Sequence, residues 1–103
     1  MQRIEKLQAF LKDNPADSFV QHALALEHIK LQDDATAKDL FLQLLTRDPG
    51  YIGSYYHLAK LLERTDRIYD AKEVYERGML KAKECGDLHT FNELKTAYDD
   101  LVF

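Results

Sequence analysis

Apolar residues recur along the chain at three- and four-residue spacing, which is the period of one buried face of an α-helix. The pattern begins near residues 2–13 and returns near 18–31, 34–47, 55–62, 67–82 and 88–101. The first stripe consists of Ile4, Leu7, Phe10 and Leu11, and the last consists of Leu88, Phe91, Leu94, Tyr98 and Leu101. No segment reads as a strand or as a linker, so the pattern predicts six helices joined by short turns.

Proline, glycine and aspartate mark the breaks between these helices. Asn14-Pro15 and Asp48-Pro49-Gly50 end two of them, because the residue before proline avoids the helical region, and Gly86 ends a third. Side chains suited to capping precede four helices: Asp17 or Ser18, the polar turn 32–34, Asp66 and Asp87. We therefore expect each of these helices to begin beside its cap.

The sequence repeats itself after 34 residues. That shift places Pro15 on Pro49, Leu24-Ala25 on Leu58-Ala59, Ala37-Lys38 on Ala71-Lys72 and Phe41 on Tyr75. The coincidences fall on proline, small and aromatic residues, which are the residues that determine turns and close helix contacts. A true internal repeat is the best explanation.

This repeat resembles the tetratricopeptide repeat (TPR) family, whose unit is a helix–turn–helix of 34 residues. The matching positions are Leu24, Ala25, Ala37, Phe41, Pro49, Tyr55, Leu58, Ala59, Ala71, Tyr75 and Gly78. The chain departs from the family pattern at Gln21, where an aromatic is usual, at His28, where tyrosine is usual, and at Lys83, where proline is usual.

The resemblance implies an all-α fold, an α-α superhelix (TPR solenoid) of about six antiparallel helices in one domain. It implies half a repeat at 1–17, full repeats at 18–51 and 52–85, and a C-terminal capping helix at 86–103. Small residues would let paired helices approach closely, while large ones fill the space between pairs. The polar side of the capping helix would consist of Glu93, Lys95, Asp99 and Asp100.

Composition narrows the class of protein. The chain has 103 residues, 46% hydrophobic and 31% charged, with a net charge of −4, typical of one soluble globular domain. That charge argues against nucleic-acid and anionic-membrane partners, although residues 60–83 hold seven Lys and Arg against five Asp and Glu. The charged N-terminus and short apolar runs predict neither an export signal nor a membrane span. One cysteine, Cys85, forms no internal disulfide, and we expect a cytoplasmic protein.

No pattern of catalytic or metal-binding residues emerges. His22 and His28 are six residues apart and so do not share a helix face, and His57 and His89 lie on other helices. His28, at a position usually aromatic, is expected to be a core histidine with a hydrogen-bond partner. The chain has no nucleotide-binding or nucleophile motif. We expect no metal, no cofactor and no enzymatic activity.

In the TPR family the first helix of each unit lines a concave groove that binds peptides or partner helices. The resemblance places the following residues there: Phe19, His22, Leu26, Ile29, Lys30, Tyr51, Gly53, Tyr56, Lys60, Glu63 and Arg64. Lys60 and Arg64 are one turn apart and could together meet an acidic group; alternatively they are solvated and paired with Glu63 or Glu73. A TPR subset clamps chaperone tails with Lys and Asn where this chain has His22 and Leu26, so we do not expect that clamp.

Two functions remain open. The first is a non-catalytic adaptor that binds a peptide or partner helix of another protein in the groove. The alternative is a self-associating assembly subunit, a homodimer formed through the groove or the terminal helix.

Overall fold

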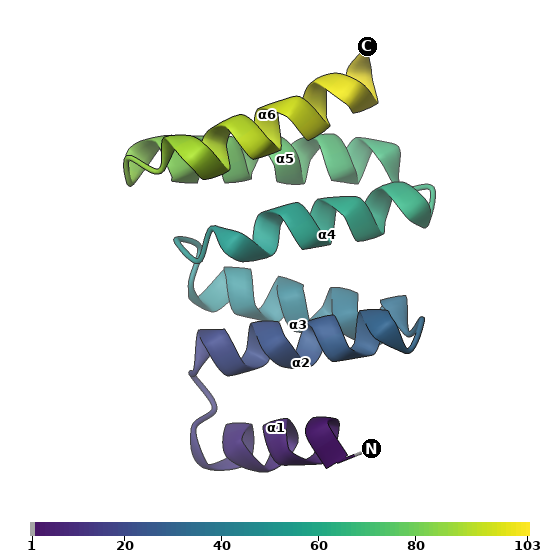
Figure 1. The fold of residues 1–103 in the computed structure, drawn as a ribbon, viewed down its shortest axis with the longest axis vertical. Coiled ribbons are helices and arrows are strands. Elements are labelled where there is room, and N and C mark those ends of the chain that lie inside the picture. Colours follow the sequence, from purple (N-terminus) through teal and green to yellow (C-terminus); the bar gives the residue numbers. More distant parts are fainter. Residues whose placement is uncertain (1) are drawn as a thin grey trace. The chain divides into compact units, whose positions relative to one another are not determined.

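The computed structural model describes residues 2–103, which contain six helices and no strand, as the apolar pattern predicts (Figure 1). The helices are α1 (Gln2–Asp13), α2 (Ser18–Lys30), α3 (Asp34–Arg47), α4 (Gly53–Arg64), α5 (Ile68–Glu84) and α6 (Leu88–Val102). They form two compact units, which we call unit 1 (α1 to α3, ending at Pro49) and unit 2 (α4 to α6, beginning at Gly50). The predicted half repeat starts at Met1, which lies outside the described residues.

In unit 1, α2 packs against both α1 and α3. The core lies between α2 and α3, where Ala25 and Ala37 have no exposed surface and Phe41 is fully enclosed. Small residues at this contact let the two helix backbones approach closely, and the aromatic ring fills the remaining space.

The first helix is less buried than its stripe predicts. Ile4, Leu7 and Leu11 are half-buried, whereas Phe10 is 47% exposed, so its assignment to the buried stripe is wrong. Successive residues are about 100° apart around a helix, which places Phe10 at the edge of the face centred on Leu7 and Leu11.

A polar network joins the two ends of the α2–α3 hairpin. The Gln21 side chain is buried; its Nε2 donates to the Leu40 carbonyl at 3.0 Å, and its Oε1 accepts from Arg47 Nη1 at 2.8 Å. Arg47 Nη2 also donates to Ser18 Oγ at 3.2 Å, and that hydroxyl donates to an Asp48 carboxylate oxygen at 2.7 Å. The buried glutamine therefore has its hydrogen bonds satisfied.

In unit 2, α5 packs against both α4 and α6. Gly78 on α5 is the point of closest approach: a Cβ there would lie 2.7 Å from Tyr55 Cβ and 3.0 Å from Leu94 Cδ1. Tyr55 is 1% exposed and Leu94 is fully buried. Glycine is needed here because only a residue without a side chain fits between α4 and α6.

The three hairpin turns share one geometry. Gln32, Asp66 and Gly86 have φ angles of 60°, 64° and 76°, in the left-handed region. In each turn the next amide donates back to a helix carbonyl: Asp33 to His28 at 2.9 Å, Arg67 to Leu62 at 2.8 Å and Asp87 to Ala82 at 2.9 Å. This arrangement satisfies carbonyls at the helix end.

Three predicted caps form and one does not. Carboxylate oxygens of Asp17, Asp33 and Asp87 accept hydrogen bonds from the amides of Val20, Thr36 and Thr90. Hydrogen bonds from Thr36 and Thr90 lower the pKa of the Asp33 and Asp87 carboxyls, respectively.

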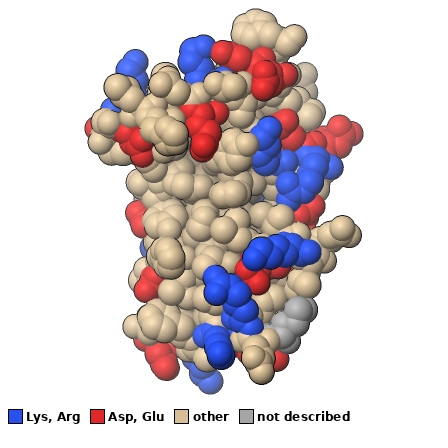
Figure 2. Space-filling view, in the orientation of Figure 1, with Lys and Arg blue, Asp and Glu red and all other residues tan. Residues whose placement is uncertain are grey.

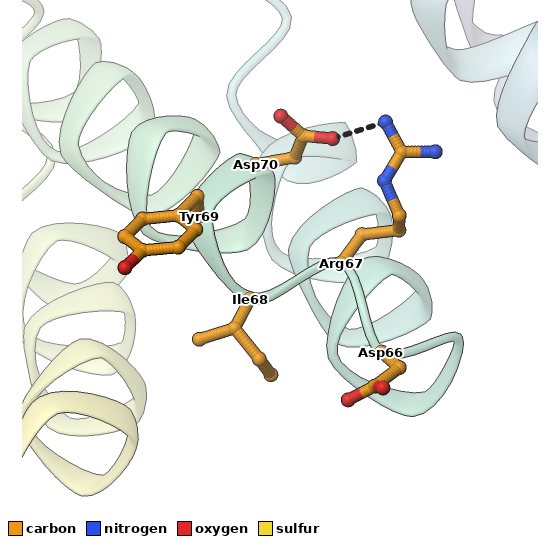
Figure 3. Close-up of a pocket in the computed structure, with 5 residues that line it drawn as sticks. All are labelled: Asp66, Arg67, Ile68, Tyr69 and Asp70. Atoms are coloured by element: carbon orange, nitrogen blue, oxygen red, sulfur yellow. Dashed lines mark ion pairs between the residues drawn. The ribbon is translucent and has the colours of Figure 1, made fainter.

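The expectation that Asp66 caps the fifth helix is wrong. Asp66 is the left-handed turn residue, and the N-cap position falls on Arg67, which makes no side-chain cap hydrogen bond. Figure 3 shows Arg67 turned instead toward Asp70, with 2.6 Å between Nη2 and the carboxylate oxygen. The cap position moves because the turn uses one more residue than the sequence suggests.

The last helix buries Leu94 and Ala97 against its unit, whereas Leu88 is 66% exposed. Leu88 therefore does not belong to the buried stripe. It lies in the first turn, about 120° round the helix from Leu94, and so faces away from the core.

Candidate functional site

A shallow groove of about 270 Å³ lies between α4 and α6 in unit 2. Its walls are two residues of α4 and four residues of α6: Tyr56, Lys60, Glu93, Thr96, Ala97 and Asp100. Tyr56 and Lys60 are among the residues that the TPR resemblance placed in a groove.

Helical spacing explains why these side chains share one surface. Tyr55 points into the core, so the next residue, Tyr56, is turned about 100° toward the groove, and Lys60 follows one turn later. On α6, Glu93, Ala97 and Asp100 follow one another at four- and three-residue spacing, which keeps them on one face.

Lys60 has a counter-charge within its own helix. Its Nζ lies 3.6 Å from a Glu63 carboxylate oxygen and 5.7 Å from the centre of the Tyr56 ring. The same Glu63 carboxylate accepts a hydrogen bond from the Tyr75 hydroxyl. Burial, together with this hydrogen bond, raises the pKa of Tyr75, so the phenol remains a donor at neutral pH. The bond from Tyr75 holds Glu63 beside Lys60.

Acidic groups outnumber basic ones along the groove. Its lining contains Lys60 against Glu93 and Asp100, and Glu63 adds a further carboxylate next to Lys60. The basic excess predicted for residues 60–83 is offset in the same way elsewhere, since Arg67 pairs with Asp70 and Lys81 with Glu84. On the face seen in Figure 2, Lys and Arg side chains lie next to Asp and Glu side chains.

His57 adds no positive charge beside Glu93. Burial lowers the pKa of this half-buried imidazole; the Glu93 carboxylate opposes the effect and the Arg64 guanidinium adds to it. The ring also lies edge-on to Tyr56, with 5.7 Å between the centres. A histidine whose pKa lies below its ordinary value is neutral at pH 7.

The remaining predicted groove residues lie elsewhere. Those of unit 1 lie along α2: Phe19 is 67% exposed, and Lys30 is exposed and pairs with Glu27 at 2.9 Å. His22, Leu26 and Ile29 are half-buried, and the His22 ring lies edge-on to Phe41. In unit 2, Tyr51, Gly53, Glu63 and Arg64 are not part of the lining of the α4–α6 groove.

Four groove residues were missed by sequence reasoning. Glu93, Thr96, Ala97 and Asp100 all belong to α6, which the repeat pattern treats as a cap with one polar side. The structure divides that polar side in two, because Lys95 pairs with Asp99 at 2.7 Å while Glu93 and Asp100 face the groove. The 34-residue comparison does not find them, since α5 is three residues longer than α3 and shifts the register of α6.

The side chains considered for metal binding or chemistry lie apart. His28 is largely buried, with Nδ1 3.3 Å from an Asp33 carboxylate oxygen, and Cys85 is exposed at the end of α5. Within residues 2–103, no three His, Cys, Asp or Glu side chains come together as metal ligands would. In the same range, no helix combines the length and the apolar character that crossing a membrane requires.

Solved structures resemble this chain closely. A tetratricopeptide repeat domain protein from Salinibacter ruber, solved in solution, is 42% identical over 85% of this chain and 89% of its own, with a TM-score of 0.82. A crystal structure of a tetratricopeptide repeat domain protein from the same organism is 42% identical over 82% and 96%, with a TM-score of 0.79. A protein from Bordetella parapertussis, 22% identical over 95% and 85%, shares the fold with a TM-score of 0.81. No family model and no curated protein matches the sequence.

Proposed function

Because the chain belongs to the tetratricopeptide repeat family, its fold is that of a protein–protein interaction module, and we propose that it binds a segment of another protein in the α4–α6 groove. The module is non-catalytic in this proposal. The observation that carries it is the groove itself, which brings Tyr56 and Lys60 of α4 together with four residues of α6.

The size and lining of the groove support a peptide rather than a small molecule. Its volume of about 270 Å³ is at the lower limit of drug-sized ligand sites, which measure about 300–1,000 Å³. Half-buried Tyr56 offers an aromatic surface with a polar end, a type of residue enriched at protein interfaces. An open groove of this kind suits side chains that protrude from a helix or an extended segment.

Substituting one exposed residue tests the proposal. Thr96→Trp fills the groove from the exposed side of α6, so folding should be retained while partner binding is lost. Lys95→Trp adds the same ring one residue earlier, outside the groove lining, and is the matched control. Affinity capture from the host with mass spectrometry should recover the same partner with the wild type and the control, and at least about tenfold less with Thr96→Trp. Equal recovery by all three proteins would contradict the proposal.

Self-association keeps one supporting observation. Leu80 and Leu88 of unit 2 are 57% and 66% exposed, and two copies could cover them. The groove proposal instead expects a monomer. Light scattering at high micromolar concentration separates the two functions, and a dimer dissociated by Leu88→Asp would favour assembly.

A further inference from the structure

We propose that the α4–α6 groove selects a partner segment in which a lysine or arginine stands beside an apolar side chain. This inference rests on the proposed function and names the chemistry of the partner that the groove recognises. It reverses the expectation that Lys60 and Arg64 receive an acidic group.

The first observation is the placement of carboxylates on α6. Glu93 and Asp100 are seven residues apart, so they lie two turns apart on the same face, at opposite ends of the α6 wall. Both residues are exposed. The lysine of this helix, Lys95, pairs with Asp99, outside the groove lining. A cation on the partner can therefore meet a carboxylate at either end of the wall.

The second observation concerns Lys60, the basic residue of the lining. Its ammonium faces Glu63 and the Tyr56 ring, and Glu63 is held by Tyr75. An incoming carboxylate would have to compete with Glu63 for Lys60 while approaching Glu93 and Asp100. Like charges at short range disfavour such a partner, whereas opposite charges favour a basic one.

The third observation is the surface between the charges. Ala97 is 6% exposed and its small side chain forms part of the lining of the groove, with the Tyr56 ring on the α4 side. An apolar side chain of the partner can bury against these two residues. The ring face also attracts cations, as its contact with Lys60 shows. An apolar contact flanked by carboxylates fits a basic amphipathic segment.

A random peptide library displayed on phage and selected on the immobilised full chain tests the partner chemistry. Enriched peptides should contain Lys or Arg next to Leu, Ile, Val or an aromatic residue, and should be depleted in Asp and Glu. The most enriched peptide and its Lys-to-Glu counterpart are then titrated by fluorescence anisotropy. Replacing the basic residues by Glu should weaken binding at least about fivefold, and raising salt should weaken the basic peptide.

The double variant Glu93→Gln/Asp100→Asn should lose about threefold to tenfold in affinity for the basic peptide and lose the preference over its Glu counterpart. The matched control, Glu73→Gln/Glu84→Gln, removes the same charge from α5, outside the groove lining, and should keep both. A preference for acidic peptides, or a preference for basic peptides that the double variant retains, would overturn the inference.

The same experiment separates this inference from the proposed function. If Thr96→Trp abolishes peptide binding but the charge substitutions leave the preference unchanged, the groove is the binding site and only its preference for basic residues is wrong. If Thr96→Trp binds every selected peptide as the wild type does, or if no peptide is enriched, the groove function fails and the inference fails with it.

Discussion

The α2–α3 and α4–α5 hairpins are copies of one repeat, yet they fill their central crossing differently. At equivalent positions, 34 residues apart, unit 1 has Gln21 and Leu44 where unit 2 has Tyr55 and Gly78. In unit 1 the larger apolar residue is on the second helix, and in unit 2 the aromatic is on the first helix and glycine on the second. The repeat therefore preserves the filled space between two helices rather than the residue at each position.

The hairpins also differ in polar contacts. Buried Gln21 needs partners and obtains them from Arg47 and the Leu40 carbonyl. At the position equivalent to Arg47, unit 2 has Lys81, which pairs with Glu84 on its own helix. An aromatic residue in place of Gln21 removes the need for a network at the other end of the hairpin.

Alanine at the two equivalent crossing positions should destabilise for opposite reasons, and this is the largest expected effect. Leu44→Ala leaves a cavity and should cost about 2–5 kcal/mol of unfolding free energy. Gly78→Ala brings a Cβ to 2.7 Å from Tyr55 Cβ, an atom that cannot rotate away, and should cost about 1–3 kcal/mol. Urea unfolding measures both. Helix propensity alone predicts that Gly78→Ala stabilises by about 1 kcal/mol, so a stabilised variant would show that the close contact is not real.

Removing the two equivalent basic side chains should give unequal losses. Arg47→Met keeps the apolar stem but removes the donor to buried Gln21, which should cost about 1–3 kcal/mol. Lys81→Met removes an i,i+3 ion pair on the helix surface and should cost at most about 1 kcal/mol. Thermal unfolding of the two variants, compared with the wild type, checks the difference. Equal losses would mean that the Gln21 network contributes no more than the surface pair does.

Glycine at the equivalent left-handed turn residues should give the smallest change, a gain in stability. Gln32→Gly relieves a conformation that costs about 1–2 kcal/mol, less about 0.5–1 kcal/mol for the added freedom of the unfolded chain, so a gain of up to about 1 kcal/mol is expected. Asp66→Gly should gain less, because aspartate tolerates the left-handed region better. Gly86→Ala is the reverse control, because its Cβ would meet nothing within 4 Å and only the backbone angle opposes it. Chemical denaturation that shows Gln32→Gly destabilised would contradict this account.

Most of the fold could be predicted because its signals are local. Apolar spacing, the proline at 15, Gly86 and the aspartates at 17 and 87 act within one helix or turn, and the structure has helices that begin and end beside them. The failures occur at the edges of these patterns. Phe10 and Leu88 have the right residue type but lie on the wrong side of their helices, and Asp66 is displaced by one residue in its turn.

The candidate site was predicted by half, because its other half comes from a second helix. Tyr56 and Lys60 follow from the repeat, whereas Glu93 and Asp100 become groove residues only when α6 lies alongside α4. The electrostatics of Lys60 depend on the same packing, since Glu63 is held beside it by Tyr75 of α5. Spacing along one helix carries no information about these neighbours.

The sequence by itself determined six helices, a 34-residue repeat and the small residues at its crossings, because periodicity and turn chemistry act over a few neighbouring residues. The tertiary structure alone decided how Gln21 is satisfied, why Gly78 has no side chain, and which charges line the groove. Those features arise where residues more than ten positions apart come within a few ångströms of one another. Burial and Coulomb interactions depend on such distances, and the order of residues along the chain does not specify them.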